Sequence, residues 1–166
     1  MLKFLTIIYI MLHLTSCSGY TPMYKKNILY KEFFQTLAIK TDNSKTTKNI
    51  KREMLKMFPY NKNIRYILSL NTVSSTSSTV NNIDGKVSGY EIETLVTAKL
   101  YERKNYDELL YSFEEKVNAP YYLTSDQVLS TLADRNKAEK LNTRNISKKI
   151  FNNLIIYLSR NSYNAN

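Results

Sequence analysis

Apolar and polar residues alternate along three stretches of the chain, as they do in strands that bury one face of a sheet. The alternation runs over residues 64–73, 87–101 and 108–117, and a shorter strand is expected over 35–40. In the longest stretch, the apolar face consists of Tyr90, Ile92, Val96, Ala98 and Leu100. In the stretch after it, the inward residues are expected to be Leu109, Tyr111, Phe113 and Val117.

Two other segments have the spacing of helices. Residues 45–58 place Ile50, Met54, Met57 and Phe58 on one stripe and basic residues around it, and Pro59 ends the pattern. After Pro120, which we expect to end the sheet, Thr124 and Gln127 form a capping box. No Gly or Pro follows up to about residue 160, which predicts a long C-terminal helix with a polar middle over 136–144.

These elements predict an α+β fold in the order β-α-β-β-β-α. An antiparallel β-sheet meander would bury one face under two helices and leave the other face to solvent or a partner. The Ser/Thr tract over 74–78 is either a long loop or a ragged edge strand. Residues 35–160 would form a single α+β domain, and residues 161–166 a disordered tail.

The first residues have the layout of an export signal. A basic start at Lys3 precedes an apolar stretch over 4–14, about half the ~20 residues that a membrane-spanning helix needs. Leu14-Thr15-Ser16-Cys17 resembles a bacterial lipobox. We therefore expect a signal peptide over 1–16, lipid on Cys17 and a tether over 17–34. Ser18, rather than Asp, after the cysteine favours the outer membrane by similarity to enterobacterial sorting rules.

The net charge and the scarcity of reactive side chains limit the classes of function that are expected. The formal charge is +10, which favours anionic partners, although an AT-rich genome that places Lys and Asn on the surface would give the same excess. The single Cys and single His, Cys17 and His13, both fall in the targeting region. The mature chain would then lack the side chains of most metal, haem and nucleophile sites. We expect no cofactor, no metal and no enzymatic activity.

Several short stretches together resemble one family, the LPS-assembly lipoprotein of the LptE type. The start of the mature chain, Cys17-Ser18-Gly19-Tyr20-Thr21-Pro22-Met23-Tyr24, is similar to the family's Cys-Gly-aromatic-x-Pro-aliphatic-Tyr motif, with one extra Ser. The C-terminal half is similar to alphaproteobacterial members in the pair Tyr121-Tyr122, the segment 131–139 and the strand segment 97–101.

This resemblance implies a partner protein rather than a catalyst. LptE-type lipoproteins sit inside an LptD-type outer-membrane β-barrel, support its assembly and help to deliver lipopolysaccharide to the cell surface. The family's glycolipid-binding residues do not transfer by motif. From position alone, Lys86, Arg103 and Lys104 are candidates for lipid A phosphates, on the expectation that they cluster at one end of the sheet. They could equally be solvated turn residues.

Other interpretations remain open. The carboxylate pairs Glu91/Glu93 and Glu114/Glu115 have the composition of a glycosidase site, but a solvated sheet face beside Lys99 and Lys116 is the simpler explanation. Export argues against nucleic acid as a partner. The main rivals to the plug are an auxiliary lipoprotein of an ABC-type lipid transport system and a generic envelope scaffold.

Overall fold

The computed structural model describes residues 23–58, 63–80, 87–123 and 127–163. The helices are α2 (Met23–Thr36), α3 (Lys45–Leu55) and α4 (Val128–Tyr163). The strands are β1 (Leu37–Thr41), β2 (Tyr66–Val80), β3 (Val87–Glu102) and β4 (Asn105–Tyr122). They form one four-stranded sheet in the order β1-β2-β3-β4.

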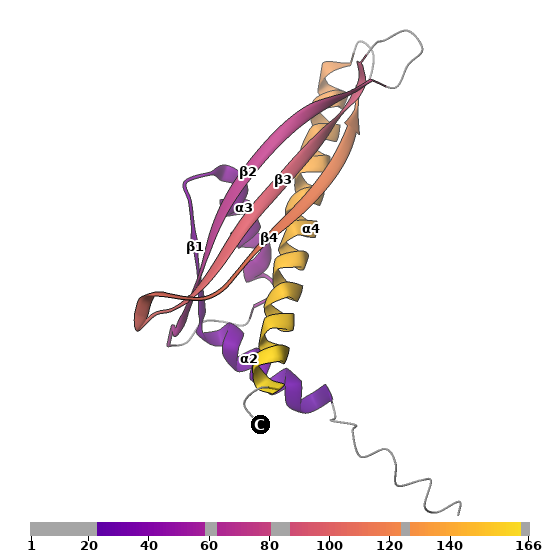
Figure 1. The fold of residues 1–166 in the computed structure, drawn as a ribbon. Helices are drawn as coiled ribbons and strands as arrows, with labels where there is room; N and C mark the ends of the chain where they lie inside the picture. Colours follow the sequence, from indigo (N-terminus) through magenta and orange to yellow (C-terminus); the bar gives the residue numbers. More distant parts are fainter. Residues whose placement is uncertain (1–22, 59–62, 81–86, 124–126, 164–166) are drawn as a thin grey trace, which may run out of the picture.

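The sheet has helices on one face only. Figure 1 shows α4 along the whole length of the curved sheet and α3 beside it, while the opposite face carries no helix. Strands β2, β3 and β4 form the antiparallel meander that the alternation predicts, which confirms the α+β class. β1 instead pairs with β2 in parallel, because the chain crosses over through α3 between these two strands. The sheet is therefore mixed.

The apolar faces predicted from the sequence meet in the main core. Val96, Ala98 and Leu100 of β3 are fully buried against Ile50 and Met54 of α3 and against the C-terminal half of α4. Leu109 differs from the prediction: it is 48% exposed, because the register of β3 and β4 shifts next to Leu100 and Tyr101.

A stack of aromatic rings closes the core at the α2 end. Phe34 of α2 stacks on Phe58 and Phe151 with ring centroids 4.7 and 4.8 Å apart, and Phe33 lies 4.9 Å from the ring of Tyr66. We expected an irregular tether over 17–34, but residues from Met23 onward form α2. Its apolar residues lack helical periodicity, and only its last turn contributes buried side chains among the described residues.

Three further boundaries differ from the sequence prediction. The Ser/Thr tract 74–78 continues β2 as regular strand, because β3 offers a pairing partner at each of these positions. Pro120 does not end the sheet: it lies inside β4, an edge strand, where a missing N–H need not cost a ladder bond. α4 extends to Tyr163, into the segment expected to be a disordered tail. Thr124 of the predicted capping box lies outside the described residues.

Candidate functional site

Of the predicted anchor and glycolipid residues, the structure describes Arg103 and Lys104. Cys17 and Lys86 lie outside the described residues. Arg103 and Lys104 follow the end of β3, whereas Lys86 directly precedes its first residue. The structure therefore places Arg103 and Lys104 together at the turn between β3 and β4, and the clustering of Lys86 with them stays a prediction.

A different cation accompanies Arg103 and Lys104. Arg65 lies just before β2, and its main-chain oxygen accepts a hydrogen bond of 2.8 Å from the Arg103 N–H. Its guanidinium donates to Glu102 Oε1 at 3.0 Å, which raises the pKa of the Arg65 side chain. Sequence reasoning missed Arg65, which the antiparallel register of β2 and β3 brings to this turn.

The carboxylate pairs have partners within the sheet and its covering helix. Glu93 forms an ion pair with Lys116, as expected for a solvated sheet face. Glu114 accepts a hydrogen bond of 2.9 Å from Thr97 Oγ1, and Glu115 forms an ion pair with Lys149 at 3.1 Å. These contacts account for three of the four carboxylates through cross-strand and helix–sheet pairing.

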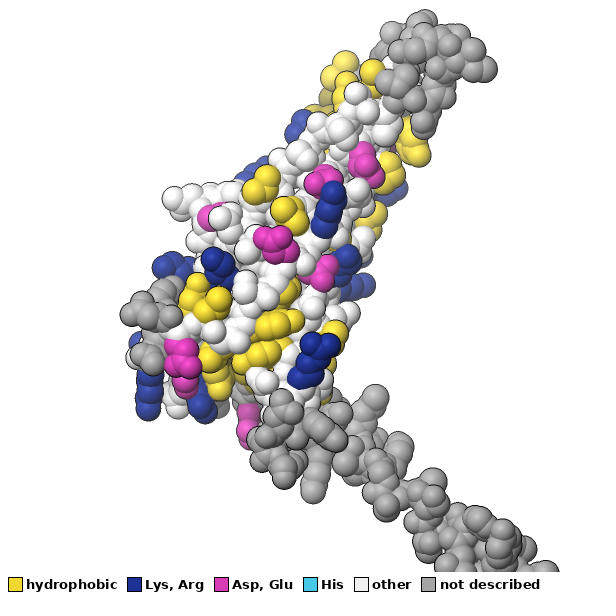
Figure 2. Space-filling model, viewed as in Figure 1, with side chains coloured by type: hydrophobic (Ala, Val, Ile, Leu, Met, Phe, Trp, Pro, Cys, Tyr) yellow, Lys and Arg dark blue, Asp and Glu magenta, His cyan; other side chains and the backbone are white. Residues whose placement is uncertain are grey.

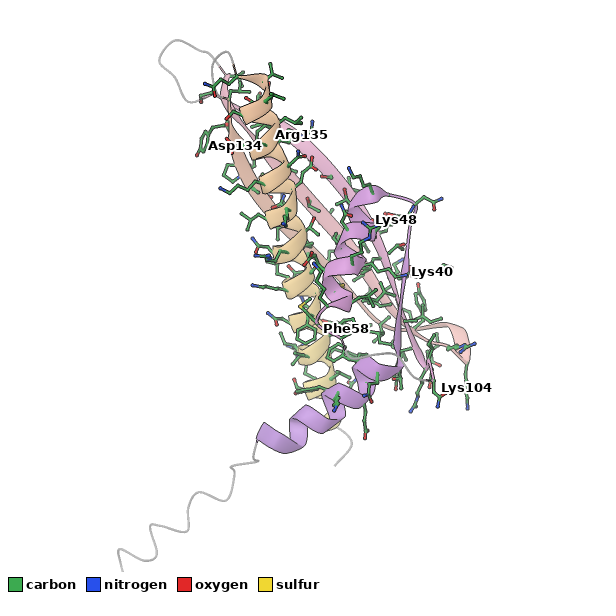
Figure 3. All side chains as sticks on the ribbon, turned by 180° about the vertical axis from the view of Figure 1, so that it is seen from behind. Lys40, Lys48, Phe58, Lys104, Asp134 and Arg135 are labelled. Atoms are coloured by element: carbon green, nitrogen blue, oxygen red, sulfur yellow. The ribbon has the colours of Figure 1, made fainter. Side chains whose placement is uncertain are left out.

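A polar cleft of about 360 Å³ opens on the helix-covered face of the sheet. Its floor is the inner face of β2 and β3, and its walls come from the first turns of α3 and from α4. Figure 3 shows Lys48 of α3 and Arg135 of α4 on either side of the sheet region that neither helix covers. The lining is rich in hydroxyl groups: Ser74, Thr76, Thr94, Thr46 and Thr143. Its charged side chains are Lys45, Arg135 and Glu139, and the Arg135 guanidinium pairs with Glu139 at 3.1 Å.

A buried polar layer separates this cleft from the core. Asn142 of α4 is only 2% exposed, and its Nδ2 donates to the main-chain oxygen of Ile92 at 2.7 Å. Ser147, one turn further on, donates to the main-chain oxygen of Thr143 at 2.7 Å and lies 3.3 Å from that of Ile50. This layer divides the main core from a smaller cluster around Ile92, Ala119 and Ala138. The polar middle of α4 thus packs on the sheet.

One carboxylate fixes the entry to α3. Asp42 accepts hydrogen bonds from the main-chain N–H groups of Ser44, at 2.8 Å, and Thr72, at 3.1 Å. Burial acts to raise the pKa of this carboxyl, but hydrogen bonds from Thr47, Ser44 and Thr72 outweigh it and hold the pKa below its ordinary value. Ser44 then caps the helix by accepting from the Thr47 N–H at 3.1 Å.

Charge is divided between the two layers. α3 and α4 contain eleven Lys and Arg residues against three Asp and Glu residues. β2, β3 and β4 together contain two basic and seven acidic residues. On the helix-free face, Figure 2 shows acidic and basic side chains interspersed, with hydrophobic side chains gathered over its lower part. Within the described residues, no helix is both long and apolar enough to cross a bilayer.

The fold is shared with bacterial lipoproteins. A lipoprotein of Caulobacter crescentus superposes with a TM-score of 0.64 at 14% identity, over 80% of this chain and 96% of the other. Rare lipoprotein B of Shewanella oneidensis gives 0.58 at 12% identity, over 76% and 98%. Lipoprotein B of Nitrosomonas europaea gives 0.61 at 14% identity, over 74% and 83%. No family model and no curated protein matches the sequence.

Proposed function

We propose that this chain is an outer-membrane lipoprotein, anchored through Cys17, that plugs an LptD-type β-barrel and supports lipopolysaccharide insertion at the cell surface. The observation that carries the proposal is the shared fold: nearly the whole length of the Caulobacter and Shewanella lipoproteins superposes on this chain. The lipobox before Cys17 supplies the anchor independently of the fold.

The surface and the dimensions suit a plug. The lumen of an outer-membrane barrel is polar, and the helix-free sheet face presents Ser, Thr, Asn and paired charges to it. α4, with 36 residues, is about 54 Å long, which exceeds the ~30 Å hydrocarbon thickness of a bilayer. A molecule of this length fills a lumen and also reaches beyond it.

Affinity capture tests the proposal. A C-terminal tag on the full chain, after gentle detergent extraction, should retain an outer-membrane β-barrel, and depletion should reduce surface lipopolysaccharide. Capture of an inner-membrane ABC-type transporter would support the auxiliary-lipoprotein alternative instead, and no stable partner would support an envelope scaffold. Cys17→Ser is the matched control for the anchor: it should leave an unacylated chain that is recovered outside the membrane fraction.

Glycolipid binding is tested separately from barrel binding. Arg65, Arg103 and Lys104 lie close together at one turn, so Arg103→Ala with Lys104→Ala should weaken binding of purified lipopolysaccharide if this turn meets lipid A phosphates. Lys86→Ala, at the other end of β3, tests the remaining candidate alone. Unchanged binding in both variants would leave these cations as solvated turn residues.

A further inference from the structure

The outer half of β2 has no neighbouring strand on one side. β1 pairs only with the first five residues of β2, Tyr66–Leu70, whereas β2 continues to Val80. The Asp42 carboxylate occupies the next main-chain donor, the N–H of Thr72. Beyond it, Val73 to Ser78 are all exposed on both faces of the sheet. Figure 1 shows no element beside this part of β2.

The hydrogen bonds between Asp42 and β2 show which main-chain groups of β2 point away from β3. The oxygen of Leu70 accepts from the Asp42 N–H, and the N–H of Thr72 donates to Asp42, so even-numbered residues of β2 bond toward the β1 side. Because strand groups alternate with a period of two, the N–H and C=O groups of Ser74, Thr76 and Ser78 point the same way. Among the described residues, none of these main-chain groups has a hydrogen-bond partner on that side.

The other edge of the sheet is protected, and this one is not. β4 contains Pro120 in its outer edge, and Lys149 of α4 covers that edge by donating to the Lys116 oxygen at 2.9 Å. Residues 71–80 of β2 contain no charged residue, no Pro and no Gly. Charge, Pro and a covering element are the usual means by which proteins block a strand edge, and within the part of the chain that the structure describes, this edge of β2 has none of them.

We propose that the edge of β2 from Ser74 to Ser78 is a docking site for an extended segment of a partner polypeptide, which adds a fifth strand to the sheet. Three consecutive outward main-chain pairs supply the hydrogen bonds of such β-augmentation. Side chains of the added strand that face the helices lie at the polar cleft, beside Lys45 and Thr46 of α3. The segment therefore carries acidic or hydroxyl side chains at alternate positions.

Charge argues against a second copy of this chain as the occupant. Edge-to-edge pairing of two copies would bring two Lys45 side chains together and join two strongly basic molecules. An acidic segment instead complements Lys45, because Arg135 is already paired with Glu139. The proposal concerns how a partner strand binds and does not depend on which envelope protein supplies it.

The test uses the full acylated chain in detergent and a synthetic peptide in which glutamate and valine alternate over about eight residues, the length of an ordinary strand. Fluorescence anisotropy should show saturable binding, and a lysine analogue of the peptide should bind at least about tenfold more weakly. Hydrogen exchange should slow about tenfold at the amides of Ser74, Thr76 and Ser78. The amides of Ser75 and Ser77, which already pair with β3, serve as internal controls.

Two edge variants make the result specific. Thr76→Pro removes an N–H that points away from β3, so it should abolish peptide binding while the sheet remains intact. Asn118→Pro places the same residue on the outer edge of β4 and should bind the peptide as the unmodified chain does. If Thr76→Pro impairs folding by circular dichroism, Thr76→Lys tests the same edge.

The proposal is overturned by either of two results. The first is absence of saturable binding, or protection that appears only on the helices. The second is formation of dimers by sedimentation, with the same amides protected without peptide, because the occupant would then be a second copy.

Discussion

Asp42 should stabilise the fold mainly in its ionised form. It accepts two main-chain hydrogen bonds, from Ser44 and Thr72, that join the start of α3 to β2. Hydrogen bonds to a charged group contribute about 1.5–3 kcal/mol each when buried and less when partly exposed, as here. Asp42→Ala, which removes both, is therefore expected to lower the free energy of unfolding by about 2 kcal/mol. Asp42→Asn keeps one acceptor and should cost about half as much.

The pH dependence of stability shows whether the ionised form of Asp42 stabilises the fold. The pKa of Asp42 is lower in the folded chain than its ordinary value, so the ionised group stabilises the folded state above the unfolded pKa of about 4, and this contribution is lost as the pH falls through the folded pKa. Urea unfolding of the original chain and of Asp42→Asn should differ most near neutral pH and converge in acid. A difference that stays constant from pH 7 to pH 3 would refute this role of the charge.

Three further predictions concern packing. Asn142→Asp should lower the free energy of unfolding by about 3 kcal/mol in urea titrations, because it buries a carboxylate beside a strand oxygen, whereas Asn142→Leu should stay within about 1 kcal/mol. Gly89→Val should cost about 1–3 kcal/mol in the same titrations, since a Cβ there would lie 2.9 Å from a main-chain oxygen of β4. Ile150→Ala should lower the thermal midpoint by several degrees, while Ile156→Ala, on the exposed side of α4, should leave it nearly unchanged.

The fold class could be predicted because its core follows simple periodicities. The alternation over β3 and the stripe of Ile50, Met54 and Phe58 predicted over residues 45–58 each identify buried residues, although α3 ends at Leu55. The pairing of β1 could not be predicted in this way. Its five residues show which face is buried, but its parallel direction depends on the path of α3, which no local pattern specifies.

The residues that define the cleft were harder to predict than those of the core. Asn142 and Thr143 lie in the polar middle of the predicted C-terminal helix, yet both are buried. A polar residue is buried where a partner exists, and the partner of Asn142 is a main-chain oxygen 50 positions away. Likewise, the Ser/Thr tract of β2 forms a strand because β3 pairs with it. Only the three-dimensional pairing reveals that its other side is open.

The way in which charge is divided between helices and strands changes what the net charge indicates about partners. The sequence total of +10 suggested a general affinity for anions, but α3 and α4 carry eleven basic and three acidic residues, while β2, β3 and β4 are acidic as a group. A polar environment that surrounded this molecule evenly would meet a basic helix layer on one face and charges of both signs on the other. The basic helices therefore select one orientation in any acidic surrounding, and the uncharged edge of β2 lies where the basic and acidic layers meet. A partner that adds a strand there would be oriented by charge before its main-chain hydrogen bonds form.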